Sequence, residues 1–342
     1  MRIALDAMGG DFAPAAVVKG AILGARANPD AHIILVGDEA AIRSVPGADV
    51  SSLENISVFH APDAVGMGEY PVSALRQKPD SSIAQAFRLV ASRKADAIVS
   101  AGNTGAMVAG AALFLKLLEG VKRPGIAITA ANPSGHCTVI DVGANVECKP
   151  LHLVQYAVMA AIYHKHVFKT ENPRVGLLSV GSEEHKGNRL SKETFPMLKE
   201  LKVNFVGNVE GADVYHGRCD IVVCDGFVGN VMLKTSEGLG ETMMMKMRES
   251  AEKDVWTRLG LKLMAPVLEG LKKWLDFSEY GGAPLLGVDG ICIICHGRSD
   301  ETAIKNALGA AVRFSQYDVN GHIVEALAEK RDVWVKAAES AV

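Results

Sequence analysis

The feature that most constrains the fold of this chain is a short apolar run that leads into a polar loop and then a helical pattern, repeated along the sequence. Residues 175–180 are a clear example, because this run is too short for a helix and lies between Pro173 and Gly181. Corresponding runs occupy residues 3–5, 97–99, 139–140, 221–224 and 291–295. Strands that alternate with helices in this way predict an α/β fold with a mainly parallel sheet.

The loops after these runs are rich in residues that suit an anion. Residues 181–188 read Gly-Ser-Glu-Glu-His-Lys-Gly-Asn, in which small residues let backbone N–H groups approach a ligand and Lys186 adds a positive charge. Comparable loops occupy residues 6–11, 100–105, 141–145, 225–230 and 296–300. Since ligands bind beyond the carboxyl ends of parallel strands, we expect these loops to converge on one crevice.

One loop leads into a long apolar helix. The helix is predicted to begin at Asn103, Thr104 and Gly105 and to continue to residue 118. Its first turn would present N–H groups without partners and the positive end of the helix dipole, which suits a phosphate group. On these residues alone, a purely structural cap is the competing interpretation.

Composition bounds the class of protein. With 342 residues, 49% of them hydrophobic, the chain can bury a full core as one large α/β unit or as two closely joined lobes. The formal net charge of −3 argues against general binding to nucleic acid. No apolar run is long enough to cross a bilayer, and Met1-Arg2 leads directly into the first strand pattern. We therefore expect a cytoplasmic protein without a signal peptide.

Six cysteines are scattered through the chain, and Cys292 and Cys295 form a Cys-x-x-Cys pair. No second pair and no nearby histidine pair completes a zinc set. In a strand, residues three apart point to opposite faces, so these two thiols could not easily share a metal. We therefore predict buried free thiols and no metal site.

Several segments, taken together and in order, carry a resemblance that none of them would carry alone. They are MRIALDAMGGD, SAGNTGA, DVGANV, KPLHLVQYA, GNVE, DGFVGNVMLKT, YGGA and HGRSDETAIKNA. The combination closely resembles the bacterial acyl-carrier-protein:phosphate acyltransferases of the PlsX type. The likeness extends over nearly the whole chain and leaves only the extreme C-terminus unmatched.

This resemblance implies a fold, an activity and a set of partners. The expected fold is a three-layer α/β/α sandwich, like those of the isocitrate and isopropylmalate dehydrogenases and the phosphotransacetylases. The expected enzyme uses no cofactor and converts long-chain acyl-ACP (acyl carrier protein) and inorganic phosphate to acyl phosphate and free ACP, for glycerophospholipid synthesis. The resemblance also implies a homodimer at the inner face of the cell membrane, where a membrane glycerol-3-phosphate acyltransferase uses the product.

The expected reaction needs phosphate held against the thioester carbonyl, and donors for the oxyanion that forms. Phosphate is a competent nucleophile and a thiolate leaves readily, so a covalent acyl-enzyme is not required, and the sequence has no Gly-x-Ser-x-Gly elbow. We predict Lys186 and Asn230 as catalytic residues, although Asn230 also suits a helix cap. The residues predicted to bind substrate, several of them mainly because they match family motifs, are Gly102, Asn103, Thr104, Gly105, Ser182, Gly187, Asn188, Asp225 and His296.

Two other activities compete with this prediction. A nicotinamide-dependent dehydrogenase could have a similar architecture, but residues 6–11 do not fit the Gly-x-Gly-x-x-Gly fingerprint. A short-chain phosphotransacetylase acting on acyl-CoA could share both the fold and the chemistry. Only a substrate assay separates that alternative from the acyl-ACP enzyme.

Residues 237–276 differ from the rest of the chain because no strand pattern follows. At helical spacing, an apolar arc is formed by Trp256, Leu259, Leu263, Val267, Leu271 and Trp274. A mostly basic arc on the other side contains Arg258, Lys262, Glu269, Lys272, Lys273 and Asp276. Such a helix suits a membrane surface or packing in a dimer, and these two uses are compatible. Its basic arc could instead dock the carrier protein.

We predict that this segment forms a projecting hairpin of two helices, with its tip at residues 260–265 and Pro266 in the first turn of the second helix. The predicted organisation is a single α/β unit over residues 1–330, which includes the hairpin at about residues 237–278. A C-terminal tail would occupy residues 331–342.

Overall fold

The computed structural model of this protein describes residues 1–251, 254–275 and 277–330. In this part of the chain, one 11-stranded sheet forms the centre of the molecule. Its strands are, in spatial order, β3 (Ile56–His60), β2 (His32–Gly37), β1 (Arg2–Asp6), β4 (Ala97–Ser100), β11 (Ile291–Ile294), β10 (Ala283–Leu286), β5 (Gly125–Asn132), β6 (Gly135–Ile140), β9 (Ile221–Val223), β7 (Arg174–Leu178) and β8 (Asn204–Val209). The predicted tail at residues 331–342 lies outside the described residues.

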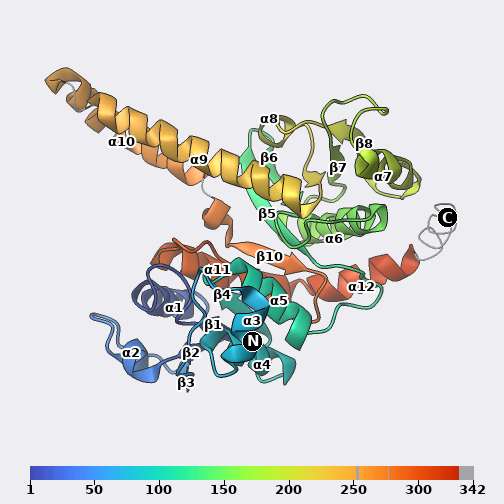
Figure 1. Cartoon of the computed structure of the whole chain (residues 1–342). Helices are drawn as coiled ribbons and strands as arrows, with labels where there is room; N and C mark the ends of the chain where they lie inside the picture. The colour runs from blue at the N-terminus through green and yellow to red at the C-terminus, as the bar shows by residue number, and fades with distance from the viewer. Residues whose placement is uncertain (252–253, 276, 331–342) are drawn as a thin grey trace.

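The sheet is mainly parallel, as predicted. Strand β10 is antiparallel to both of its neighbours, and β5 is antiparallel to β6, whereas the other neighbouring pairs are parallel. Figure 1 shows that β10 and β5 join two lobes. We call the part with β1–β4 and β11 the lower lobe and the part with β6–β9 the upper lobe.

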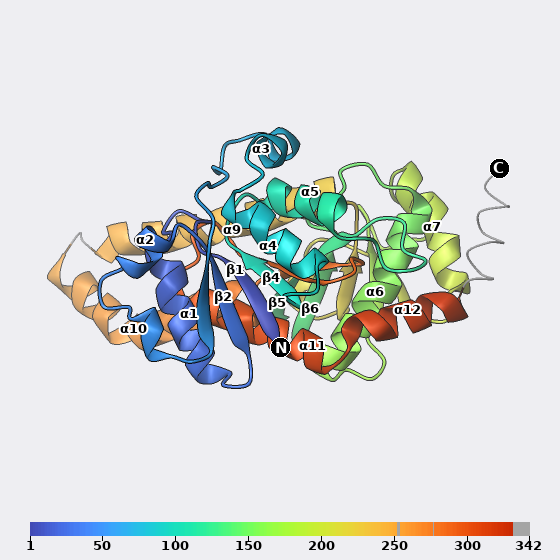
Figure 2. The same ribbon diagram turned by 90° about the horizontal axis from the view of Figure 1, so that it is seen from below.

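Helices cover both faces of the sheet. They are α1 (Ala15–Ala27), α2 (Glu39–Arg43), α3 (Pro71–Gln77), α4 (Ser82–Ala91), α5 (Thr104–Phe114), α6 (Pro150–Phe168), α7 (Arg189–Glu200), α8 (Asp213–His216), α9 (Gly226–Ala251), α10 (Val255–Leu275), α11 (Glu301–Gln316) and α12 (Val319–Glu329). Figure 2 shows α3, α4 and α5 on one side of the sheet and α1, α11 and α12 on the other. The predicted three-layer α/β/α sandwich is therefore confirmed.

The core follows the alternation of side chains along the strands. In β1, Ile3 and Leu5 belong to the hydrophobic core on one face, whereas Ala4 belongs to the core on the other face, and all three are fully buried. Helices α1 and α11 pack closely on the first of these faces. A Cβ atom at Gly20 would lie 2.6 Å from the Cβ atom of Ile304, so only glycine allows this approach.

Helices α9 and α10 form the predicted projecting hairpin (Figure 1), but the predicted position of its tip was wrong. Helix α9 ends at Ala251 and α10 begins at Val255, so residues 260–265 and Pro266 lie inside α10. The physical reason is the cap at Asp254, whose carboxylate accepts hydrogen bonds from Trp256 N at 2.8 Å and Thr257 N at 2.9 Å.

His164 is the least satisfied polar side chain of helix α6. It is 2% exposed, and among the described residues neither ring nitrogen has a hydrogen-bond partner. The imidazole lies beside Phe168, with their ring centroids 5.0 Å apart. Burial lowers the pKa of His164 to about 4, although the nearby charge of Asp220 acts in the opposite direction. The folded protein therefore holds this imidazole neutral at neutral pH.

We predict that His164 makes folding stability sensitive to acid. The pKa of His164 is lower in the folded state than the ordinary value near 6.5. Protonation therefore favours the unfolded chain, and the free energy of unfolding is unaffected above pH 6.5 but falls as the pH drops from 6.5 toward 4. Between pH 7 and pH 5, this loss should be about 2 kcal/mol. Chemical denaturation of wild type and His164→Leu at both pH values measures it. Equal pH dependence in the two proteins would contradict the assignment.

Candidate functional site

The polar loops of the lower lobe are held together by a buried carboxylate at the end of β1. Asp6 is 2% exposed and accepts a hydrogen bond from Ser100 Oγ at 2.7 Å, and Ser100 Oγ accepts one from Gly102 N at 3.0 Å. A Cβ atom at Gly9 would lie 2.6 Å from Asp6 Oδ2, so the chain passes directly over the carboxylate. Burial raises the pKa of Asp6, and the hydrogen bond from Ser100 opposes that rise.

Asn103 serves as the N-cap of α5. Its Oδ1 atom accepts a hydrogen bond from Ala106 N at 3.0 Å, and its Nδ2 atom donates to the backbone oxygens of Met67 at 3.0 Å and Glu69 at 3.1 Å. The side chain is thus engaged in the structure of the lower lobe. Among the described residues, the N–H groups of Thr104 and Gly105 have no hydrogen-bond partner. The N-terminus of α5 is therefore a candidate binding site for an anion.

A second buried carboxylate organises the upper lobe at the end of β6. Asp141 is fully buried and accepts hydrogen bonds from the backbone N–H groups of Ile126, Gly143, Ala144 and Asn145, at 2.8–3.1 Å. Burial raises the pKa of Asp141, and these four donors act in the opposite direction. The sequence predicted this loop but not the role of Asp141 in holding it, because the donors include a residue on another strand.

The loop at residues 141–145 forms the base on which α9 begins. Asn145 O accepts a hydrogen bond from Gly226 N at 2.8 Å, and Asn145 Nδ2 donates to Tyr156 OH at 2.9 Å. Asp225 caps α9, because its carboxylate accepts from the N–H groups of Phe227 and Val228, each at 3.0 Å. The helix therefore begins at Gly226.

Asn230 lies in the first turns of α9 and is exposed. Because Asp225 is the cap, Asn230 does not serve as the cap that its sequence position suggested. Its Cγ atom lies 3.8 Å from the position that a Cβ atom at Gly143 would take, which places the side chain over the Asp141 loop. Among the described residues, the Asn230 amide has no hydrogen-bond partner, so it is available to a ligand.

The two lobes meet where α9 passes the loop after β11. Lys234 Nζ lies 3.4 Å from His296 Nε2 and 2.7 Å from Glu237 Oε2. One turn beyond Glu237 along α9, Glu241 forms an ion pair with Arg298 at 2.6 Å. Lys234 is four residues from Asn230, so both lie on the same side of the helix. The structure thereby brings the predicted residues Asn230 and His296 to one place and adds Lys234, which the sequence reading missed.

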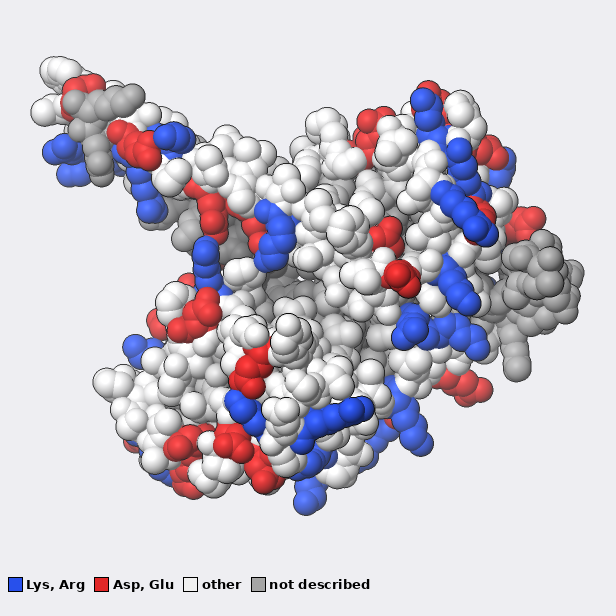
Figure 3. Space-filling view, viewed as in Figure 1, with Lys and Arg blue, Asp and Glu red and all other residues white. Residues whose placement is uncertain are grey.

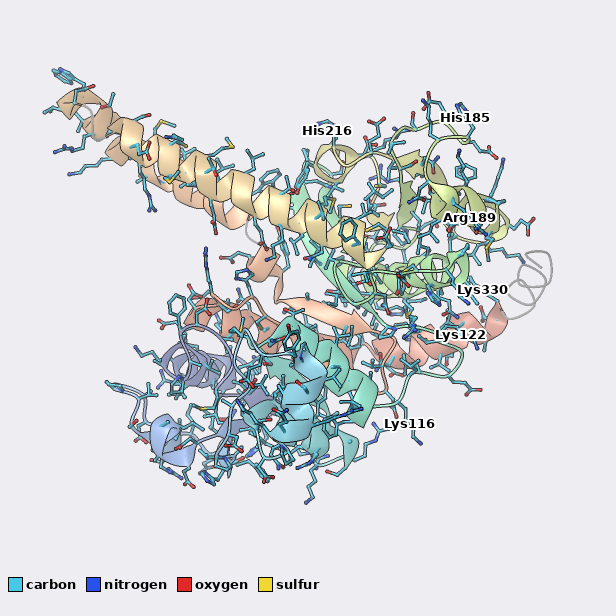
Figure 4. All side chains as sticks on the ribbon, in the orientation of Figure 1. Lys116, Lys122, His185, Arg189, His216 and Lys330 are labelled. Atoms are coloured by element: carbon cyan, nitrogen blue, oxygen red, sulfur yellow. The ribbon has the colours of Figure 1, made fainter. Side chains whose placement is uncertain are left out.

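The loop at residues 181–188 begins where β7 ends and is largely exposed. Asn188 caps α7 by accepting a hydrogen bond from Ser191 N at 2.9 Å, and Gly187 has a φ of +109°, which favours glycine. Ser182 and Lys186 are exposed, and the Lys186 ammonium has no ion-pair partner among the described residues. Figure 4 shows His185 at the outer end of the upper lobe.

No hydrogen bond or ion pair among the described residues joins this loop to Asn230, His296 or the first turn of α5. The predicted convergence of loops is therefore visible for the segments at β1, β4 and β11, and for those at β6 and β9. The predicted contribution of Lys186 and its neighbours stays a prediction.

The cysteines lie in the cores of the sandwich or close to them. Cys292 and Cys295 are buried on opposite faces of the sheet, as their spacing predicted, and burial raises the pKa of Cys295 to about 12. Cys148 lies beside the loop at residues 141–145, with its Sγ atom 3.5 Å from Asn145 O, and burial raises its pKa to about 11. Such thiols are poor nucleophiles at neutral pH. Within residues 1–251, 254–275 and 277–330, no group of three or more His, Cys, Asp or Glu side chains has the geometry of a metal site.

Comparison with solved structures confirms the fold. Over 96% of this chain and 94% of the other, the protein superposes on the EutD phosphotransacetylase from Staphylococcus aureus, with a TM-score of 0.55 and 15% identity. It superposes similarly on a phosphotransacetylase from Streptococcus pyogenes, with a TM-score of 0.56 and 14% identity over 96% and 94% of the two chains. At this identity, the likeness establishes the architecture and nothing beyond it.

Comparison of sequences gives the family. The phosphate acyltransferase of Endomicrobium trichonymphae is 46% identical to this chain, with 96% of this chain and 98% of that protein covered. The phosphate acyltransferase of Geobacter sulfurreducens is 47% identical, with 95% and 94% covered. A family model described as "Fatty acid synthesis protein" matches residues 1–322. These matches confirm the resemblance found in the sequence motifs, and the chain belongs to the fatty acid synthesis protein family.

Proposed function

We propose that this protein is a phosphate acyltransferase that transfers a long-chain acyl group from the thioester of ACP to inorganic phosphate. The products are acyl phosphate and free ACP, which would supply glycerophospholipid synthesis. The observation that carries this proposal is the similarity to curated phosphate acyltransferases over nearly the full length of both chains. The two loop clusters that meet at α9 agree with it, because they offer donors from both lobes to one substrate.

In this reaction, a phosphate oxygen attacks the thioester carbonyl, the C–S bond breaks and the thiolate of ACP leaves and takes up a proton. The free N–H groups of Thr104 and Gly105, at the positive end of α5, would hold phosphate. The Asn230 amide would donate to the oxyanion. The charge of Lys234 is partly neutralised by its ion pair with Glu237, so stabilising the negative charge of phosphate and of the oxyanion calls for a second cation. We assign this role to Lys186, which has no ion-pair partner among the described residues.

Direct transfer is favoured over a covalent acyl-enzyme. The thiols closest to the loop at residues 141–145 are those of Cys148 and Cys224, and burial raises the pKa of both. A protonated thiol, whether half-buried like Cys148 or buried like Cys224, does not compete with phosphate as a nucleophile at neutral pH. The structure therefore supports a site that positions two substrates and stabilises charge.

A phosphotransacetylase acting on acyl-CoA is the second candidate, because the solved structures of similar fold include enzymes of that class. A direct assay separates the two. Purified protein is incubated with phosphate and either long-chain acyl-ACP or acetyl-CoA, and acyl phosphate is measured as its hydroxamate. Turnover of acyl-ACP without turnover of acetyl-CoA is the expected result. The opposite preference would overturn the proposal.

We predict that Lys186→Ala lowers acyl phosphate formation by about 10²-fold or more at saturating phosphate, because a charge that stabilises the transition state is removed. Lys192→Ala is the matched control, since Lys192 is exposed on the neighbouring first turn of α7 and has no ion-pair partner among the described residues. Its turnover should match wild type. If Lys186→Ala keeps wild-type turnover while Lys234→Ala loses it, the catalytic cation is on α9 and the assignment to Lys186 is wrong.

We also propose that the hairpin of α9 and α10 binds the membrane surface and that the protein is a homodimer, as the family resemblance implies. Along the apolar arc of α10, Trp256 is 80% exposed and Leu263 is 74% exposed. Toward the base of the hairpin, Trp274 is only 38% exposed. Arg258 and Lys262 are exposed on the same helix, and their charges would favour anionic lipid. In the described part of the chain, no helix is both long and apolar enough to span a bilayer.

We predict that Leu263→Glu lowers binding to anionic liposomes by about tenfold, because it places a negative charge in the apolar arc. Ala265→Glu adds the same charge on the opposite side of α10 and is the matched control. Sedimentation with liposomes measures binding, and light scattering measures the oligomeric state. Both variants should stay folded, dimeric and active on acyl-ACP. If Leu263→Glu unfolds the protein or dissociates a dimer, Leu263 is buried between protein surfaces and the membrane proposal fails.

A further inference from the structure

A group of exposed cations without carboxylate partners surrounds the N-terminus of α6. We call Lys122, Arg123 and Lys149 the α6 basic patch. All three are exposed, and none has an ion-pair partner among the described residues. Two of them act on one common neighbour, since burial and then the charges of Arg123 and Lys149 lower the pKa of His152, and Lys122 directly precedes Arg123 in its loop. The cations thus lie close to one another although they come from two different loops.

The patch is held in place by α6. Gln155 fixes the first loop, because its Oε1 atom accepts a hydrogen bond from Lys122 N at 2.9 Å and its Nε2 atom donates to Gly120 O at 2.8 Å. His152 fixes the second loop, because its Nδ1 atom accepts from Lys149 N at 3.1 Å. These hydrogen bonds fix the backbone at Lys122 and Lys149, so neither loop has to become ordered when a folded partner binds.

The surface around the patch has a local excess of positive charge, although the chain as a whole carries −3. Figure 4 places Lys122 beside Lys330 and above Lys116, and Figure 3 shows blue side chains gathered on that flank. The carboxylates nearest in sequence are those of Glu119 and Glu147, which form no ion pair with the patch. The charge is therefore available to an acidic partner.

The patch also adjoins the candidate site. One turn beyond His152, Tyr156 OH accepts a hydrogen bond from Asn145 Nδ2 at 2.9 Å, and Asn145 O receives the first N–H group of α9. The charge of Arg123 acts on Tyr156 as well. A partner bound at the patch could carry a thioester on a flexible arm. That thioester would reach the loop at residues 141–145 at the point where α9 begins.

From this juxtaposition we propose that the α6 basic patch is the docking surface for the acidic carrier protein that presents the acyl thioester. The proposal rests on the proposed function, because that function supplies the carrier. Charge complementarity at a rim raises the rate of association and orients the partner. A lipid surface is the weaker occupant, because Figure 1 shows the apolar hairpin projecting from the other end of the molecule, so a membrane bound there leaves the patch free.

The test compares two substrates on one variant, Lys122→Glu/Lys149→Glu. One substrate is acyl-ACP, and the other is the same acyl group on pantetheine, which lacks the carrier protein. For acyl-ACP, kcat/KM should fall about tenfold or more through KM, and the loss should shrink as salt rises. For acyl-pantetheine, kcat/KM should change by less than about twofold. Lys94→Glu, which reverses the charge of one exposed lysine just before β4, should behave as wild type.

Each outcome decides between the two proposals. If wild type turns over neither acyl-ACP nor acyl-pantetheine, the proposed function fails. If wild type is active and the variant keeps its KM for acyl-ACP, docking at the patch is overturned. An equal loss of kcat/KM on both substrates would place the cations at the reacting centre and overturn docking. If sedimentation shows that the variant loses binding to liposomes while its kinetics are unchanged, the patch is a lipid contact and docking is again overturned. Circular dichroism checks the fold, and Lys122→Gln/Lys149→Gln replaces the variant if it does not fold, with a smaller rise in KM expected.

Discussion

The buried carboxylate of Asp141 is the interaction on which the upper half of the site depends. Its oxygens accept four backbone N–H groups, from β5 and from the loop that follows β6. Without this acceptor, each buried N–H group would lack a partner, at a cost of roughly 1–3 kcal/mol apiece. The loop that it holds is the base for Gly226 and Asn230. The position of the first turn of α9 is therefore fixed by a carboxyl group that is itself fully buried.

The lower lobe repeats this solution with a different residue. Asp6 at the end of β1 holds Ser100, and through Ser100 the backbone at Gly102, immediately before the N-terminus of α5. In both lobes, a buried carboxylate holds the backbone of a loop. The N–H groups of Thr104 and Gly105 in one lobe, and the Asn230 amide in the other, stay free for a ligand. Such a loop is already ordered before the substrate arrives, which lowers the entropy that binding must overcome. Two ordered loops from separate lobes can then act on one thioester.

Sequence alone predicted the α/β fold, the strand-end loops and the family, because periodicity and turn residues are local signals. It failed where the deciding contact is tertiary. Lys234 is an ordinary helical lysine until the loop after β11 brings His296 to it, and the tip of the hairpin depended on the cap at Asp254 rather than on Gly260 or Pro266. Lys186 shows the same limit, since the composition of its loop predicts a role in anion binding but not its distance from Asn230.

The separation of surfaces follows from the chemistry of the substrate and the product. The substrate is a thioester held by a water-soluble protein, so it can be recognised by charges carried on ordered loops, such as those of Lys122 and Lys149, and salt will weaken that recognition. The product has a long apolar chain and a phosphate group, so it gains by leaving toward lipid. A hairpin that begins at the first turn of α9 links the proposed reacting centre to an apolar end. If both proposals hold, a carrier on the other flank can dissociate without crossing the membrane surface.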